Sequence, residues 1–282
     1  MNGPLKWHGG KAYLAKQIVE LMPRRCANPG APNPLDHGWL HYVEPYFGGG
    51  SVLLANEPDG ISEVVNDFNS ELTNFWNVLA KPDLFQKFLR AIEATPFSEE
   101  LFIQSGDPTI QNESPTSRAF WFFVRCRQSL AGRMDSFAPR SRSRTRRGMN
   151  EQVSAWLNAI EGLPAVHERL KRVLILSRPA LEVIRAEDGP RTLFYLDPPY
   201  LHETRTTIDE YGQHEMSRDD HHQLLCLLLD VKGRFLLSGY RSRLYDDFAK
   251  TANWRRLDFD LPNNAAGGAE KRRMTESVWM NY

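Results

Sequence analysis

The sequence predicts an α/β protein, with an open, mostly parallel seven-stranded sheet and an inserted helical module. Short apolar runs typical of strands alternate with runs typical of helices, the pattern of parallel sheets joined by crossover helices. Between residues 81 and 170 this alternation stops, because helical patterns dominate there. The last two strand candidates have no helix between them, so we expect them to pair antiparallel.

The elements follow in chain order. The strand candidates are 40–44, 62–66, 172–177, 193–196, 234–238, 254–259 and 277–281. Outside the insert, the helical patterns are 12–21, 51–56, 70–79 and 217–231, the last with Ser217 as its N-cap. Inside the insert they are 85–92, 98–104, 117–129, 153–160 and 165–171. We therefore expect residues 1–80 and 171–282 to form one domain and residues 81–170 to form the inserted one.

The tetrapeptide Asp197-Pro198-Pro199-Tyr200 follows the buried strand candidate 193–196. Ligands gather where the strands of an open α/β sheet end, so we expect these residues to face a site. Their chemistry suits an amino group conjugated to an aromatic ring. The Asp197 carboxylate accepts one N–H, the Pro198 carbonyl accepts the other, and Tyr200 offers a flat face to a base, worth ~1–3 kcal/mol. For the motif alone, a strand that merely ends in a proline turn is the alternative.

A glycine turn, Phe-Gly-Gly-Gly at positions 47–50, follows the first strand candidate and precedes an apolar helix. Glycines let the backbone approach a ligand closely, and the N-terminus of the helix offers unpaired N–H groups. The second strand candidate ends at Asp67, where doubly wound folds place an acid that binds ribose hydroxyls. The turn lacks the G-x-G-x-x-G pattern, so nucleotide phosphates are not its expected ligand.

Together with the N-terminal segment Lys6-Trp7-His8-Gly9-Gly10-Lys11, these motifs resemble the DNA adenine methyltransferase family, the Dam-like amino-methyltransferases that use S-adenosylmethionine. That family opens with aromatic-x-G-G-K, continues with an acid-P-x-x-G-G-G turn and an N-D pair, and carries D-P-P-Y late. All four occur here in that order, and the segments 232–240 and 275–282 resemble the family's closing strands. The resemblance covers residues 5–80 and 172–282 and implies the sheet of such methyltransferases.

The resemblance implies a role for individual residues. Catalysis is expected from Asp197, Pro198 and Tyr200, acting on a base flipped out of the duplex. Cofactor contacts are expected from Trp7, Lys11, Glu44, Phe47, Gly48, Gly49, Gly50, Asp67 and Asp197, with Asp67 on the cofactor ribose. Family members often carry an acid after the third strand to bind the cofactor adenine. Here the corresponding stretch, 177–182, lacks that acid directly after the strand, so either Glu182 or backbone contacts would bind the cofactor adenine.

The chain has zero formal net charge, yet its segment 118–147 holds nine arginines and one acid. Such a basic stretch is the usual electrostatic footprint of nucleic acid binding, and a solvated loop is the alternative. We expect double-stranded DNA to contact Arg127, Gln128, Arg133, Arg140, Arg142, Arg144, Arg146 and Arg147. Of these, Arg127, Gln128 and Arg133 are the candidates for reading base edges.

Composition bounds the remaining possibilities. No apolar stretch approaches the ~20 residues of a membrane span, and the N-terminus lacks a signal-peptide core. Cys26, Cys126 and Cys226 are few and far apart, so we expect a cytoplasmic protein with neither disulfides nor a bound metal.

The sequence thus predicts a site-specific enzyme that moves a methyl group from S-adenosylmethionine to N6 of an adenine in double-stranded DNA. Three alternatives stay open: methylation of cytosine N4, methylation of adenine in RNA, and a silent relative that only binds DNA. A cognate restriction endonuclease is a candidate partner. The recognition sequence and the oligomeric state are left open.

Overall fold

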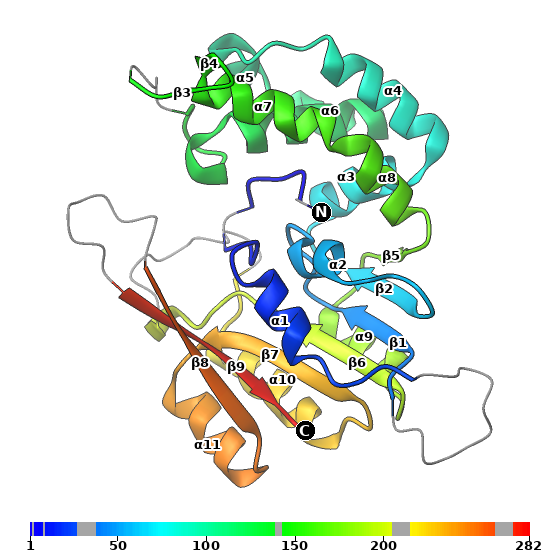
Figure 1. The fold of residues 1–282 in the computed structure, drawn as a ribbon, viewed down its shortest axis with the longest axis vertical. Helices are drawn as coiled ribbons and strands as arrows, with labels where there is room; N and C mark the ends of the chain where they lie inside the picture. Colours follow the sequence, from blue (N-terminus) through cyan, green and yellow to red (C-terminus); the bar gives the residue numbers. More distant parts are fainter. Residues whose placement is uncertain (2, 8, 27–37, 139–142, 205–214, 263–272) are drawn as a thin grey trace. The chain divides into compact units, whose positions relative to one another are not determined.

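The computed structural model describes residues 1, 3–7, 9–26, 38–138, 143–204, 215–262 and 273–282 (Figure 1). They form two compact units, which we call unit 1 and unit 2. Unit 1 comprises Met1–Leu21, Gly48–Glu57 and Asn69–Ile175. Unit 2 comprises Met22–Phe47, Pro58–Phe68 and Leu176–Tyr282.

The seven-stranded sheet confirms the predicted fold class. Its strands are β1 (His41–Glu44), β2 (Ser62–Asn66), β5 (Leu174–Leu176), β6 (Thr192–Leu196), β7 (Arg234–Tyr240), β8 (Arg255–Pro262) and β9 (Arg273–Met280), in the order β5-β2-β1-β6-β7-β9-β8. Strands β2, β1, β6 and β7 run parallel. Strand β9 is antiparallel to both β7 and β8. The antiparallel pairing of the last two strands is thus confirmed, and β9 additionally lies between β7 and β8.

Strand β1 is the point at which the order of the sheet reverses. The next strand along the chain, β2, pairs with one edge of β1, and β6 pairs with the other. Open α/β sheets bind ligands outside the carboxyl ends of their strands at such a reversal. The ends of β2, β1 and β6 are therefore the part of the sheet where a site is expected.

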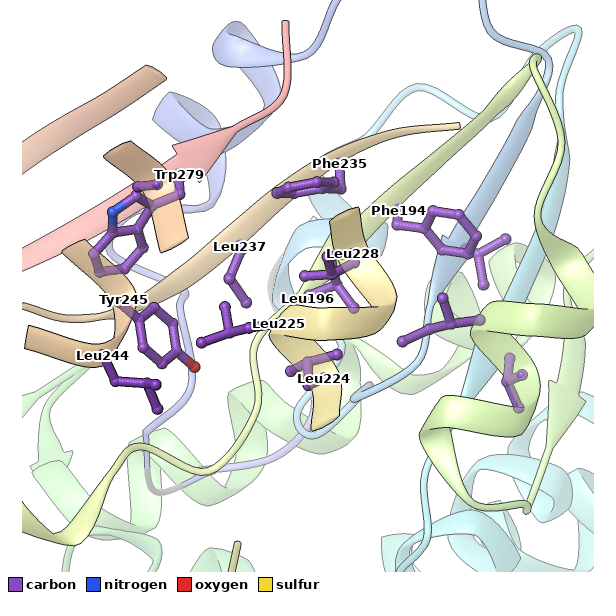
Figure 2. Close-up of a cluster of buried hydrophobic side chains, with 14 of the residues drawn as sticks. Phe194, Leu196, Leu224, Leu225, Leu228, Phe235, Leu237, Leu244, Tyr245 and Trp279 are labelled. Atoms are coloured by element: carbon purple, nitrogen blue, oxygen red, sulfur yellow. The ribbon is translucent and has the colours of Figure 1, made fainter. Parts of the chain in front are cut away.

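The core of unit 2 lies between this sheet and three helices: α9 (Ala180–Glu187), α10 (Arg218–Asp230) and α11 (Arg243–Thr251). Figure 2 shows Leu224, Leu225 and Leu228 of α10 packed with Leu196 of β6 and Leu237 of β7. The five residues of β6 are all buried. This burial explains why β6 reads as a continuous apolar run rather than as an alternating one.

Helix α10 begins at its predicted N-cap. The Ser217 hydroxyl accepts from the backbone N–H of Asp220, and the Asp220 carboxylate accepts from the backbone N–H of Ser217. This reciprocal pair is a capping box, which satisfies two donors at the helix start. The prediction of Ser217 as N-cap is confirmed.

Unit 1 is mainly helical. Its helices are α1 (Ala15–Leu21), α2 (Ser51–Ala55), α3 (Ser70–Ala80), α4 (Pro82–Glu93), α5 (Glu99–Gln104), α6 (Pro115–Gln128), α7 (Glu151–Glu161) and α8 (Leu163–Leu170), with 3₁₀ turns at Pro108–Asn112 and Leu130–Gly132. A further 3₁₀ turn, His202–Thr204, lies in unit 2. The helices predicted for this part of the chain are confirmed within a few residues at each end. Phe75, Phe88, Phe123 and Trp156 form an aromatic core among α3, α4, α6 and α7.

A short β-hairpin follows the helices α5 and α6. Strands β3 (Thr145–Arg146) and β4 (Met149–Asn150) pair antiparallel around Arg147 and Gly148. Both turn residues have positive φ, 55° and 73°, as a two-residue type I′ turn requires. This part of the arginine-rich tract has no hydrophobic period, and the hairpin was not predicted from it.

The predicted insert, residues 81–170, lies entirely within unit 1. Unit 1 also contains the N-terminal segment Met1–Leu21, the segment Gly48–Glu57 with the three glycines of the turn, and helix α3. The division of labour between a catalytic and a target-recognition domain stays a prediction.

Candidate active site

Three acids lie at or just beyond the carboxyl ends of neighbouring parallel strands in unit 2. Glu44 is the last residue of β1, and Asp67 and Asp197 directly follow β2 and β6. Since the carboxyl ends of parallel strands meet at one edge of the sheet, the three acids belong to the same edge. Two of them, Asp67 and Asp197, are partly exposed, whereas Glu44 is buried.

The D-P-P-Y motif is anchored through its tyrosine. The Tyr200 hydroxyl lies 3.2 Å from Oδ1 of Asp197 and 3.0 Å from Oε1 of Glu276 on β9. The ring of Tyr240 packs edge-on against the Tyr200 ring, with 4.6 Å between centroids. Tyr200 is only 7 % exposed, so a base that stacks on it must first displace groups that now cover the ring.

Two buried tyrosines border these acids. The Tyr42 hydroxyl donates to Oε1 of Glu44 at 2.7 Å. Burial, together with the neighbouring charge of Glu44, raises the pKa of Tyr42 well above its usual value, so the phenol stays protonated as a donor. Burial likewise raises the pKa of Tyr245, with smaller contributions from the charges of Tyr46 and Asp197. Both phenols therefore stay neutral beside the acids.

Asn66 joins three segments at the edge of the sheet. Its side-chain amide donates to the carbonyls of Pro45 and Arg178, both at 3.0 Å, and its carbonyl accepts from the N–H of Arg178 at 2.9 Å. These bonds hold the loops after β1, β2 and β5 together. Asp67, the next residue, is thereby fixed at the sheet edge while its side chain stays partly exposed.

The glycine turn begins with Phe47, a buried residue of unit 2 whose N–H donates to the carbonyl of Asn66 at 2.9 Å. In unit 1, Gly48 and Gly50 adopt positive φ values of 50° and 68°, which glycine adopts without strain. A Cβ on Gly49 would lie 2.7 Å from Cβ of Trp7. The glycines are therefore required by the turn itself and by the close approach of Trp7.

The N-terminal residues of the predicted cofactor set also lie in unit 1. Trp7 is partly buried, and its ring lies 6.3 Å from that of Phe122. Lys11 is 4 % exposed, and its ammonium donates to the carbonyl of Gly9 at 2.8 Å. Trp7 thus lies close to Gly48 and Gly49, while Lys11 is held by its own loop.

Comparison with known proteins assigns this arrangement to a family. Residues 7–258 match the model of a family described as D12 class N6 adenine-specific DNA methyltransferase. The chain belongs to this family. Its members act on N6 of adenine in DNA, which selects the first of the activities considered above over cytosine N4 and RNA.

Two curated relatives match this methyltransferase over nearly its whole length. The chain is 26 % identical over 288 residues to the type II methyltransferase M1.LlaDCHI of Lactococcus lactis subsp. cremoris. The aligned region covers 98 % of this chain and 94 % of the relative. It is 24 % identical over 307 residues to the type II methyltransferase M.MjaIII of Methanocaldococcus jannaschii, and this aligned region covers 99 % of this chain and 98 % of the relative. Both relatives are named type II methyltransferases, and each match extends over nearly the whole of both sequences.

Two residues that were expected to read bases are held inside unit 1. Gln128 is fully buried; its amide donates to the carbonyl of Pro96 at 3.1 Å and accepts from the N–H of Ser98 at 3.0 Å. The Arg127 guanidinium donates to the carbonyl of Ala155 at 2.6 Å, and burial lowers the pKa of Arg127. A base contact by Gln128 would require two hydrogen bonds to break, at a cost of about 1 kcal/mol or more each.

The remaining DNA candidates are more accessible. Arg133, Arg144, Arg146 and Arg147 are all exposed, the last three on or beside the hairpin β3–β4. Arg147 forms an ion pair with Glu161 at 3.0 Å. The two other candidates, Arg140 and Arg142, lie outside the described residues.

The structure adds residues at the sheet edge that sequence reasoning did not select. Phe68, next to Asp67, is 64 % exposed, which is unusual for a phenylalanine and places an aromatic ring beside that acid. Glu276 and Tyr240 contact Tyr200. Glu276 lies just before the strand candidate 277–281 and among polar neighbours, so no local signal singled it out. Glu182, the open candidate for the cofactor adenine, is exposed in the first turn of α9, and nothing in the structure assigns it that role.

Among the described residues, no helix is long and apolar enough to cross a membrane. The same residues contain no group of three or more histidine, cysteine, aspartate or glutamate side chains placed to hold a metal ion.

Proposed function

We propose that this family member transfers a methyl group from S-adenosylmethionine to N6 of an adenine flipped out of a specific double-stranded DNA sequence. The observation that carries the proposal is the position of Asp197-Pro198-Pro199-Tyr200. The motif directly follows β6, at the carboxyl edge of the parallel sheet and beside the reversal of strand order. This is where an open α/β sheet presents catalytic groups.

The residues of the motif act on the target amine. The adenine amino group is a poor nucleophile because its lone pair is delocalised into the ring. Asp197 accepts one of its N–H groups and the carbonyl of Pro198 accepts the other, which orients the nitrogen lone pair. Tyr200 stacks on the base, worth ~1–3 kcal/mol and offsetting part of a flipping cost of a few kcal/mol. Positioning and stabilisation of the charge that grows on nitrogen lower the barrier.

The chain also offers groups that suit the cofactor. Asp67 is a partly exposed carboxylate able to accept hydrogen bonds from ribose hydroxyls, and the exposed ring of Phe68 beside it suits the flat face of an adenine. For Trp7, Lys11, Glu44, Phe47 and Gly48–Gly50, the proposed cofactor contact rests on the family resemblance. When bound, S-adenosylmethionine supplies the methyl group as an electrophile.

DNA contact is proposed for the exposed arginines of the tract Arg133–Arg147. Each phosphate that such a side chain neutralises releases counterions, so these contacts raise affinity for any sequence. The hairpin β3–β4 supports the proposal, because it presents Arg144 and Arg146 on a defined backbone rather than on an unstructured loop.

One assay tests the proposed activity. Purified protein is incubated with methyl-labelled S-adenosylmethionine and DNA from a host without methyltransferases, and the DNA is then digested to nucleosides. We expect label in N6-methyldeoxyadenosine and none with Asp197→Ala. Label in N4-methylcytosine or preferentially in added RNA would replace the proposed substrate, and no label at all would indicate a silent DNA-binding relative.

Both relatives are named type II methyltransferases. We propose that this enzyme likewise works beside a cognate restriction endonuclease. Mapping the methylated context in the same DNA gives the recognition sequence. DNA modified at that sequence should then resist a type II endonuclease that cuts there, and unmodified DNA should be cut.

A further inference from the structure

Glu276 is a buried acid in direct contact with the D-P-P-Y motif. It lies on β9, 76 positions after Tyr200, and it is 4 % exposed. Its Oε1 lies 3.0 Å from the Tyr200 hydroxyl, which also lies 3.2 Å from Oδ1 of Asp197. One phenol is thus placed between two carboxylates.

The phenol has one proton for these two acceptors. An ionised carboxylate only accepts hydrogen bonds, so the Tyr200 hydroxyl makes one full bond, to either Asp197 or Glu276. Glu276 is both the nearer and the more buried acid. A buried carboxylate depends more strongly on a donor than one at the partly exposed edge of the sheet.

We propose that Glu276 is a positioning residue for methyl transfer, a step that rests on the function proposed above. The Glu276 carboxylate accepts the hydrogen bond that the Tyr200 hydroxyl donates, and this bond holds the ring in place. It thereby keeps the hydroxyl proton away from Asp197, whose oxygen then accepts the N–H of the target amine. Without Glu276, the hydroxyl turns to Asp197 and occupies the acceptor that the reaction needs.

The strand pairing explains how Glu276 can serve this purpose. In the β7–β9 ladder it lies directly opposite Tyr240, the residue whose ring packs edge-on against Tyr200. In the β8–β9 ladder it lies opposite Phe259. Because β9 is paired along both edges, the backbone of Glu276 is held in place, and two facing residues together fix the tyrosine of the motif.

A double-mutant cycle tests the proposal. The wild-type protein, Glu276→Gln, Tyr200→Phe and the double variant are compared in kcat for adenine methylation and in KM for S-adenosylmethionine. The glutamine amide can donate to the phenol oxygen and turn its proton toward Asp197, so kcat should fall by at least about tenfold, as expected when a charge-assisted bond is removed. The cofactor KM should stay within about twofold, because Glu276 acts on the target amine and not on cofactor binding.

Tyr200→Phe removes the contested proton. It should lower kcat by only about three- to fivefold, because the ring loses its restraint while Asp197 stays available. In that background Glu276→Gln should have no further effect, so the double variant should be more active than Glu276→Gln alone. If the kcat losses of the two single variants instead multiply in the double variant, the proposal is overturned and Glu276 has a general structural role.

Ser277→Ala is the matched control. Ser277 is the next residue of β9, is fully buried, and donates to Oδ1 of Asp258 at 2.8 Å. Ser277→Ala should leave kcat unchanged. Combined with Tyr200→Phe, it should give the same kcat as Tyr200→Phe alone. If Glu276→Gln does not fold, the kcat of Tyr200→Phe tests the proposal by itself. A kcat equal to that of the wild-type protein would overturn it, because the hydroxyl would then position nothing. An inactive wild-type protein would instead count against the proposed function.

Discussion

Asp197 follows a strand whose five residues are all buried, so the sheet itself holds this carboxylate at the site. Asp197→Ala should abolish methyl transfer and leave the dissociation constant of S-adenosylmethionine within about tenfold, because the acid acts mainly on the target amine. Asp197→Asn should fare nearly as badly, since its amide can present NH₂ where an acceptor is required. Single-turnover methylation and titration calorimetry measure the two quantities. Substantial turnover by the alanine variant would refute the mechanism.

Asp67 differs from its neighbour Asn66 in what it contacts. Asn66 is buried and bonded to the backbone of two loops, whereas Asp67 keeps a partly exposed carboxylate. Asp67→Ala should weaken S-adenosylmethionine binding by about 1.5–3 kcal/mol, the value of hydrogen bonds to a charged group. Isothermal titration decides this, with Asp59→Ala, an exposed acid beyond the site, as control. An unchanged dissociation constant would remove Asp67 from the cofactor site.

The glycine turn shows how one residue type can answer two requirements. The sequence predicted close approach of a ligand at Gly48–Gly50. The structure shows two positive φ values and the Trp7 side chain against Gly49. Packing against Trp7 is a local reason for the glycine that holds whether or not a ligand is bound.

At the scale of elements, the hairpin β3–β4 gives part of the arginine tract a definite shape. Replacing Arg140, Arg142, Arg144, Arg146 and Arg147 with serine should weaken DNA binding at every sequence alike, because phosphate contacts carry no sequence information. The slope of log affinity against log salt should flatten by about 0.9 for each phosphate of duplex DNA that the variant no longer neutralises. Titrations at several salt concentrations, on cognate and scrambled duplexes, measure both effects.

Arg133→Ala is the comparison for this experiment. It should relax the methylation context, at about 1–3 kcal/mol, if Arg133 reads a guanine. The five-arginine variant should keep the wild-type context and the wild-type affinity for cofactor alone. If its salt slope is unchanged, the tract is a solvated segment and DNA docks elsewhere.

For the molecule as a whole, the chain passes repeatedly between the two units. It crosses at the glycine turn, between Phe47 and Gly48, and directly after Asp67-Phe68, between Phe68 and Asn69. Two of the motifs proposed to contact the cofactor therefore lie where the chain leaves unit 2 for unit 1. Neither unit is a continuous stretch of sequence.

Cofactor binding should stabilise the whole fold. A ligand that binds only the folded protein adds about 2.7 kcal/mol of stability at a concentration 100 times its dissociation constant. S-adenosylmethionine should therefore raise the melting temperature of the wild-type protein and of Asp197→Ala alike. At the same concentration Asp67→Ala should show a clearly smaller rise. Differential scanning fluorimetry measures this, and equal shifts in all three proteins would contradict the assigned roles.

The seven strands of the main sheet, most helices, the Ser217 cap and the end of β6 at the D-P-P-Y motif could be predicted because their signals are local. An apolar run, a helical period, a capping residue or a proline turn depends on neighbours a few positions away. The order of motifs likewise allowed the family to be recognised. These local signals were sufficient for the fold class and for the position of Asp197 at a strand end.

Other features depend on residues far apart in the chain. No local pattern places β9 between β7 and β8, or Glu276 against a tyrosine 76 positions earlier. Gln128 looked like a surface residue able to read adenine, but it is fully buried and bonded to the backbone of Pro96 and Ser98. Strand order, burial and the placement of two carboxylates beside the Tyr200 hydroxyl arise when distant segments pack together, so no stretch of sequence contains them.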